Sequence, residues 1–317
     1  MPGLNDFLLG GLLPMGVALV ACALGWTAAR RSSVAWLAGV VAGVWAGTIA
    51  LEAASVGLGG AIQKSLKPHS AYEWAPWLVV VALLPAIAPS LPGRWRHLQW
   101  LFIAPLAALT PAWLLWGGKY LPSAELREAG FTEHAWGPGQ AVLILGLAAA
   151  ALISAWRWWT STEPVDQPAL RGVLLAIALA GAAATAGLTG SFVYAQAIGV
   201  VAATVGGAAV ATWLLRISAG PEAAASPILF LAWILLILAA CYSTLLPLQG
   251  VGLWLAITFA AAPMPARLRL GNHKRLALRV ALTLLPLAIV LGHAGYKFAE
   301  TQRQQQEEAE SNPYLNY

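Results

Sequence analysis

Glu52 is an acidic residue within a continuous apolar run, TIALEAASVGLGG. An ionisable side chain at the centre of a membrane span costs about 2.5–3.5 kcal/mol on insertion scales, so such residues often bind or couple substrates. If the span begins near Ser33, Glu52 lies ~28 Å along a helix rising about 1.5 Å per residue, close to the outer headgroups. The alternative to a substrate-binding carboxylate is therefore a solvated residue at the end of a span.

His293 is the second candidate, in the run LLPLAIVLGHAGYKF. A haem site would need a second axial histidine at similar depth on a facing helix. His97 and His273 fall at the opposite, inner side, so we expect no haem. The outer-side residues His69, Glu73, Glu133 and His134 lack a metal-site spacing, so we expect no metal and no other cofactor.

Proline and interior polar residues complete the candidate site. Pro85 and Pro111 interrupt the third and fourth apolar runs. Discontinuous helices line substrate sites in many transporters, although proline also simply bends membrane helices for packing. The predicted substrate-binding residues are Glu52, Pro85, Pro111, Tyr194, Gln196 and His293. No nucleotide-binding, metalloprotease or serine-hydrolase motif is present, so we assign no catalytic residue.

The composition excludes an ordinary soluble domain. Apolar residues make up 59% of the chain and charged residues 10%, and the mean hydropathy is +0.71. A soluble domain carries about 25% charged residues. The net charge of +5 comes without a nucleic-acid-binding motif, so we expect no nucleic-acid partner.

Ten apolar stretches are long enough to cross about 30 Å of hydrocarbon. The sequence therefore predicts an all-α polytopic membrane protein with spans at 7–28, 34–54, 74–92, 98–117, 140–158, 172–189, 192–214, 227–247, 249–266 and 277–297. Most tryptophans, among them Trp36, Trp156 and Trp159, fall near predicted span ends, which is typical of an interfacial belt.

Basic residues set the predicted orientation. Short loops rich in Lys and Arg stay on the cytoplasmic side. Twelve of the 18 Lys and Arg residues, among them Arg171, fall in one set of connections, which places the N- and C-termini outside. The segment 263–279 carries five of them, and we expect these to bind anionic lipid headgroups: Arg267, Arg269, Lys274, Arg275 and Arg279.

We expect one transmembrane domain, 1–298, with candidate halves 1–158 and 171–298, and a polar outside tail, 299–317. Small residues repeat every four positions within 172–207, which predicts a tight helical hairpin or a subunit interface. Ser123 is a suitable N-cap and Gly130 a suitable stop for a short surface helix. The first half of the tail has the composition to extend the last span.

Two functions fit these features. The first is a permease or flippase for a small uncharged or lipidic substrate, based on the ten spans and the interrupted helices. The second is a non-catalytic scaffold or assembly subunit, whose protein partner would bind the 299–317 tail or the small-residue faces of 172–207. An enzyme has the least support. The short loops favour a bacterial cytoplasmic (inner) membrane.

Overall fold

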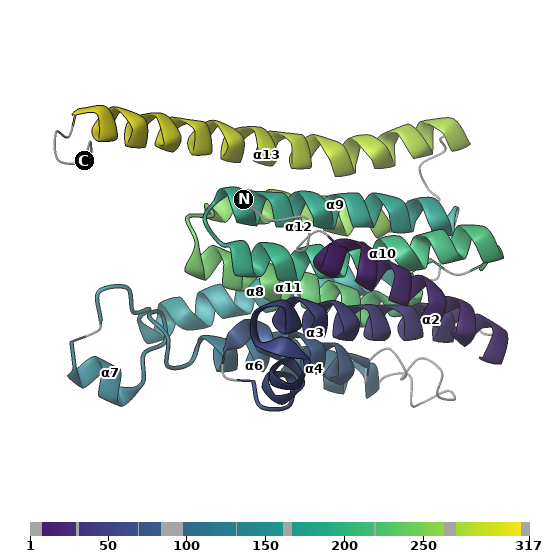
Figure 1. Cartoon of the computed structure of the whole chain (residues 1–317), viewed down its shortest axis with the longest axis horizontal. Helices are drawn as coiled ribbons and strands as arrows, with labels where there is room; N and C mark the ends of the chain where they lie inside the picture. The colour runs from purple at the N-terminus through teal and green to yellow at the C-terminus, as the bar shows by residue number, and fades with distance from the viewer. Residues whose placement is uncertain are drawn as a thin grey trace.

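The computed structural model describes residues 8–29, 32–68, 70–83, 98–130, 132–160, 167–218, 220–262 and 271–311. These residues form helices without a named strand (Figure 1). In chain order the helices are η1 (Leu8–Leu12), α2 (Leu13–Ala29), α3 (Ser32–Leu66), η2 (Ala71–Trp74), α4 (Ala75–Val81), α6 (Leu98–Leu115), α7 (Ala124–Glu128), α8 (Pro138–Trp159), α9 (Pro168–Leu188), α10 (Phe192–Leu215), η5 (Pro221–Ala224), α11 (Ala225–Tyr242), α12 (Pro247–Ala261) and α13 (Asn272–Ser311).

The chain is an α-helical integral membrane protein. Seven helices among the described residues are long and apolar enough to cross a membrane, and two further apolar helices, Phe102–Leu115 and Pro247–Ala261, are shorter. The expected third span, 74–92, is helical at Ala75–Val81 and runs into residues outside the described part. The count of ten spans and the orientation stay predictions.

Helix α11 forms the centre of the bundle. Almost all of its residues are buried, as expected for a helix that is apolar on every side. It contacts α4, α8, α10 and α12. Its Trp233 indole Nε1 donates to the Ala148 carbonyl of α8 at 2.9 Å, which satisfies the one polar atom of a large buried ring.

Small residues let α10 approach three other helices closely. A Cβ placed on Gly172 would lie 2.7 Å from the Ala209 Cβ, so α9 and α10 pack as the predicted tight hairpin. On another face, a Cβ on Gly43 of α3 would lie 2.6 Å from Thr204, and one on Gly207 would collide with the Met15 carbonyl of α2. Close backbone approach is how membrane helices gain packing energy.

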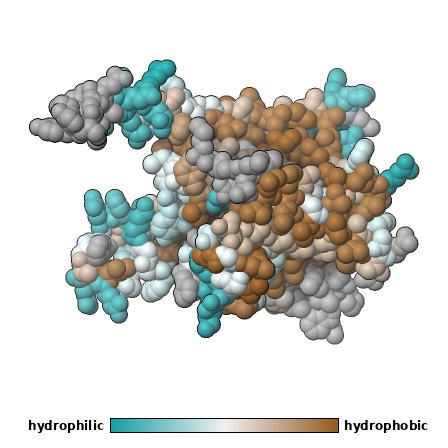
Figure 2. Space-filling model, viewed as in Figure 1, coloured by the Kyte–Doolittle hydropathy of each residue, from teal (hydrophilic) through white to brown (hydrophobic). Residues whose placement is uncertain are grey.

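The surface separates apolar and polar residues along the helix axes. In Figure 2 hydrophobic residues cover the middle of the visible face, and hydrophilic residues gather towards its ends. The polar ends include α7 and the C-terminal part of α13, which lie at the same end in Figure 1. The Ser123 hydroxyl caps α7 by accepting from the Leu126 amide at 3.4 Å, and α13 continues to Ser311, so both of these local predictions are confirmed.

Helix α6 continues through Pro105 and Pro111, in agreement with the reading that proline only bends a membrane helix. A discontinuous helix is found in α3, where Gly57 adopts φ 74° and ψ 162°. The expectation of an interfacial belt is wrong for three tryptophans. Trp36, Trp156 and Trp159 are buried inside the protein and do not belong to an interfacial belt. The interior holds these rings because adjacent helices carry small residues, such as Gly172 beside Trp36.

Candidate functional site

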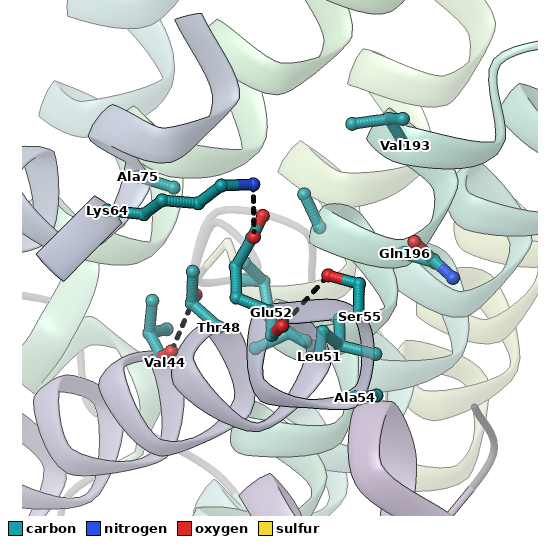
Figure 3. A pocket seen from close by; sticks show the side chains of 13 residues that line it. Val44, Thr48, Leu51, Glu52, Ala54, Ser55, Lys64, Ala75, Val193 and Gln196 are labelled. Atoms are coloured by element: carbon teal, nitrogen blue, oxygen red, sulfur yellow. Dashed lines mark hydrogen bonds and ion pairs between the residues drawn. The ribbon is translucent and has the colours of Figure 1, made fainter. Parts of the chain in front are cut away.

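A cavity of about 340 Å³ lies between α3, α10 and the start of α4 (Figure 3). Its polar wall comes from both sides of the Gly57 break in α3 and from α10. Its apolar wall includes Val193, Val200 and Val201 of α10. The complete lining is Val44, Thr48, Leu51, Glu52, Ala54, Ser55, Lys64, Ala75, Val193, Gln196, Ala197, Val200 and Val201.

Glu52 and Lys64 form an ion pair in this cavity, with Lys64 Nζ 3.0 Å from Glu52 Oε2. The side chains are 12% and 38% exposed, respectively. Twelve residues of straight helix would separate them by about 18 Å, which two side chains do not span. The break at Gly57 turns the second segment of α3 back over the first, and this turn brings the charges together.

The returning segment of α3 is held by α4. The Trp77 indole Nε1 donates to the Ser65 carbonyl at 2.6 Å, one residue beyond Lys64. Trp77 also packs edge-on against Trp45 of α3, with ring centroids 5.3 Å apart. Trp77 therefore contacts α3 on both sides of the break and holds the segment that carries Lys64 in place.

The hydroxyl groups of the cavity are largely committed to the helix backbone. Ser55 Oγ donates to the Glu52 carbonyl at 2.9 Å, and Thr48 Oγ1 donates to the Val44 carbonyl at 2.8 Å. The remaining polar contribution comes from the ion pair and from Gln196, an exposed residue of α10 that lines the opposite wall (Figure 3). The described lining contains no histidine or cysteine. Its ion pair and its amide side chain can bind a ligand through hydrogen bonds.

The structure brings together two of the six predicted substrate-binding residues, Glu52 and Gln196. Tyr194 lies on another face of α10 and stacks on Tyr242 of α11, with ring centroids 6.2 Å apart. Pro111 is buried within α6 and does not line this cavity. Pro85 lies outside the described residues.

His293 lies in a second cavity, of about 470 Å³, between α13, the start of α12 and the α9–α10 turn. Its Nδ1 is 2.9 Å from the Gln249 side-chain nitrogen. No residue lines both this cavity and the Glu52 cavity.

The basic segment is only partly at the surface. Lys274 is exposed and Arg275 half-buried, whereas Arg279 is buried and donates from Nη2 to the Ala262 carbonyl at 3.4 Å. Arg279 thus stabilises the carboxyl end of α12, where a cation complements the helix dipole. Arg267 and Arg269 lie outside the described residues.

Sequence reasoning missed Arg171, which it treated as a loop residue. Arg171 is 1% exposed and donates to the Ala261 carbonyl, next to the carbonyl that Arg279 binds. Its position could have been found from helical spacing, because it shares the buried stripe of Leu174, Leu175 and Ala178. The sequence carries no comparable signal for Lys64, whose position depends on the turn at Gly57.

No group of three or more His, Cys, Asp or Glu residues in the described ranges is arranged to hold a metal ion. Comparison with known proteins found no matching family model, no matching curated protein and no matching solved structure.

Proposed function

We propose that this protein is a permease or flippase for a small uncharged or lipidic substrate, and that the Glu52 cavity is its substrate site. The observation that carries this proposal is the neutralised Glu52–Lys64 pair at the break in α3. Discontinuous helices are the usual element around the substrate sites of membrane transporters.

The charge of the cavity supports an uncharged or zwitterionic substrate. Glu52 and Lys64 are the charged residues of the described lining, and they cancel. A ligand with net charge would have to disrupt the pair or leave its own charge uncompensated, which is costly away from water. A ligand with a polar group and an apolar body would meet the ion pair and Gln196 on one side and the valines of α10 on the other.

The test uses the purified full-length chain in lipid vesicles containing phosphatidylethanolamine and phosphatidylcholine that carry the label on an acyl chain, so that each headgroup stays zwitterionic. A membrane-impermeant reductant measures how fast labelled lipid crosses the bilayer, and release of trapped glycerol tests for small solutes. We expect one of these rates to exceed that of protein-free vesicles, and Glu52→Gln and Gln196→Leu to lower it at equal incorporation. Glu128→Gln, which changes an exposed carboxylate of α7, is the matched control.

Rates equal to those of protein-free vesicles for both substrate classes would overturn the permease or flippase proposal. Transport that is unaffected by Glu52→Gln and Gln196→Leu would remove the cavity from the transport path.

The second candidate function, a scaffold or assembly subunit, is favoured by α13. This helix runs to Ser311, and residues 301–308 are exposed along it. The glycines at 172, 206 and 207 are in contact with other helices of the same chain, which leaves the tail as the stronger candidate for a partner contact. Purification from native membranes with and without residues 299–317 tests this: a stoichiometric protein lost on truncation supports a scaffold.

We also propose that Arg267, Arg269, Lys274 and Arg275 bind anionic lipid headgroups. Lys274 and Arg275 lie in the first turn of α13, at the end of the bundle opposite α7 (Figure 1). Each cation near an anionic surface contributes about 1 kcal/mol. The buried Arg279 is left out of this group.

A further inference from the structure

The second cavity has a chemistry of its own. It lies at the end of the bundle that carries α7 and the C-terminal part of α13 (Figure 1), bounded by the α9–α10 turn, the start of α12 and α13. Its polar lining contains His293, Lys297 and the amides of Gln302 and Gln305, and its rim contains Phe192 and Phe298. Its volume of about 470 Å³ falls in the range of small-molecule sites.

Gln249 determines which hydrogen-bonding group His293 offers to the cavity. The Leu246 amide donates to Gln249 Oε1 at 2.9 Å, so the side-chain nitrogen of Gln249 must face His293 Nδ1, also at 2.9 Å. An amide nitrogen donates and does not accept. Nδ1 therefore accepts this hydrogen bond, and Nε2–H is the donor that the ring offers to the cavity. Gln249 is 6% exposed, so burial helps to hold this orientation.

Several hydroxyl groups of the cavity are not available as hydrogen-bond donors to a ligand. The hydroxyls of Thr189, Thr244 and Thr301 donate to backbone carbonyls at 3.0 Å. The donors that face a ligand are then His293 Nε2–H, the Lys297 ammonium group and the glutamine amides. Hydrogen bonds from such groups suit an oxyanion.

The charge of the cavity also favours an anion. Lys297 is the charged residue among those described in the lining. Its ion pair with Glu300 has an N–O distance of 2.9 Å, but the side chains are 60% and 40% exposed. Such exposed pairs are weak and are screened by salt, so an anionic ligand can replace the Glu300 carboxylate.

The apolar rim indicates what the oxyanion is attached to. Phe192, Leu246 and Phe298 are 61%, 49% and 43% exposed and border the same cavity. Aromatic and aliphatic side chains beside a cationic site provide a surface for an acyl chain. We propose that this cavity binds the phosphate ester of an anionic lipid headgroup, with His293 Nε2–H and Lys297 as donors and the acyl chains lying against Phe192 and Phe298.

The experiment is photolabelling of the full-length chain by a phosphatidylglycerol that carries a diazirine in its acyl chain close to the glycerol. The protein is reconstituted in nanodiscs of phosphatidylcholine with a small fraction of the probe, and the labelled peptides are mapped by mass spectrometry. We expect label in the peptides that contain Phe192, Leu246 and Phe298. Mapping by peptide separates this site from the lipids bound at Lys274 and Arg275.

Lys297→Gln should lower labelling of these peptides about fivefold, the effect of one cation near an anionic surface, and His293→Phe should lower it while keeping an aromatic ring. Lys119→Gln, which changes an exposed lysine 5.8 Å from the Tyr242 ring at the end of α11, is the matched control and should leave labelling unchanged. All three positions are exposed, so the variants should fold, and circular dichroism checks this.

Two further measurements decide whether the bound oxyanion belongs to a lipid or to free phosphate. Loss of label on adding millimolar inorganic phosphate, but not chloride of equal ionic strength, would assign the site to free phosphate and overturn the lipid. Labelling that Lys297→Gln and His293→Phe leave unchanged, or that is equal for a phosphatidylcholine probe, would overturn the proposal. Neither outcome bears on transport through the Glu52 cavity, since the two cavities share no residue.

Discussion

Lys64 lies 3.0 Å from Glu52 although both residues belong to α3 and are separated by twelve positions. The contact exists because the helix turns back at Gly57, and it closes the polar side of the Glu52 cavity. The same pair thus ties together the two segments of α3 and sets the net charge of the candidate substrate site.

A double-mutant cycle measures the coupling free energy between Glu52 and Lys64. Glu52→Gln, Lys64→Gln and the double variant should show a coupling free energy of about 1 kcal/mol in unfolding by denaturant in mild detergent, because one partner is largely shielded from water. The exposed Lys67, directly after the end of α3, provides the control, and Lys67→Gln should not couple to Glu52→Gln. Equal coupling for Lys64 and Lys67 would mean that the contact contributes nothing specific.

Gly57→Ala should destabilise the protein by about 1–3 kcal/mol, because its φ and ψ lie in a region that is accessible almost only to glycine. A Cβ at this position meets no atom within 4 Å, so the cost is conformational and not steric. Gly59→Ala is the control, since Gly59 is helical and equally unobstructed. Thermal unfolding of the two variants in one detergent compares them directly, and equal melting temperatures would contradict the prediction.

Gly207→Ala should separate α2 from α10, because the added methyl group would collide with the Met15 carbonyl. Overpacking of this kind costs about 1–3 kcal/mol. In Gly199→Ala, on the same helix, the new methyl group meets no atom within 4 Å, so this variant should be neutral or slightly stabilising. Fluorescence-detected size exclusion after heating ranks both variants against the unmodified chain, and a Gly207→Ala protein that survives as well as Gly199→Ala would refute the close approach.

Lys274→Gln and Arg279→Gln should have different effects although both remove one cation from the same basic segment. Lys274→Gln should weaken retention of phosphatidylglycerol about fivefold and leave stability unchanged. Arg279→Gln should lower stability by about 1–3 kcal/mol, since a buried helix end loses a charged donor. Native mass spectrometry and thermal unfolding provide the two measurements, and 1 M salt should abolish only the first effect.

The predicted orientation can be tested with cysteine substitutions, since Cys22 and Cys241 are buried. An impermeant maleimide added to intact cells should modify Ser123→Cys and Gln305→Cys and should not modify His273→Cys until the membrane is opened. Modification of the first two from opposite sides would overturn the threading with both termini outside.

Helix positions could be read from the sequence because length and apolar composition determine them, as for α9 and α10. Local signals were also sufficient for Ser123 at the start of α7. The expected span 34–54 ends shortly before Gly57, but the sequence does not predict that the next segment of α3 turns back over the first. That segment is held by Trp77, which donates to the Ser65 carbonyl and packs against Trp45. Of the two readings of the prolines, the structure supports simple bending, because neighbouring helices accommodate Pro105 and Pro111 without ending α6.

The candidate site was recovered only in part. Glu52 was identifiable as a carboxylate in an apolar run, and Gln196 faces the same cavity. The Lys64–Glu52 pair and the contact of Gln249 with His293 have no local signal, because each joins residues that only the tertiary fold brings together. Arg171 and Arg279 show the opposite error, in which a charge was read as loop or lipid contact although both side chains bind carbonyls at the end of α12.

The contact between Gly207 and the Met15 carbonyl has a consequence for biosynthesis. At about 5–20 residues per second, a ribosome needs roughly 10–40 s to extend the chain from the first of these residues to the second. During that interval the surface of α2 around Met15 faces lipid or the insertion machinery, since α10 has not yet been made. The packing of α2 against α10 is therefore completed only late in synthesis, because the N-terminal helices enter the bilayer before this neighbour exists.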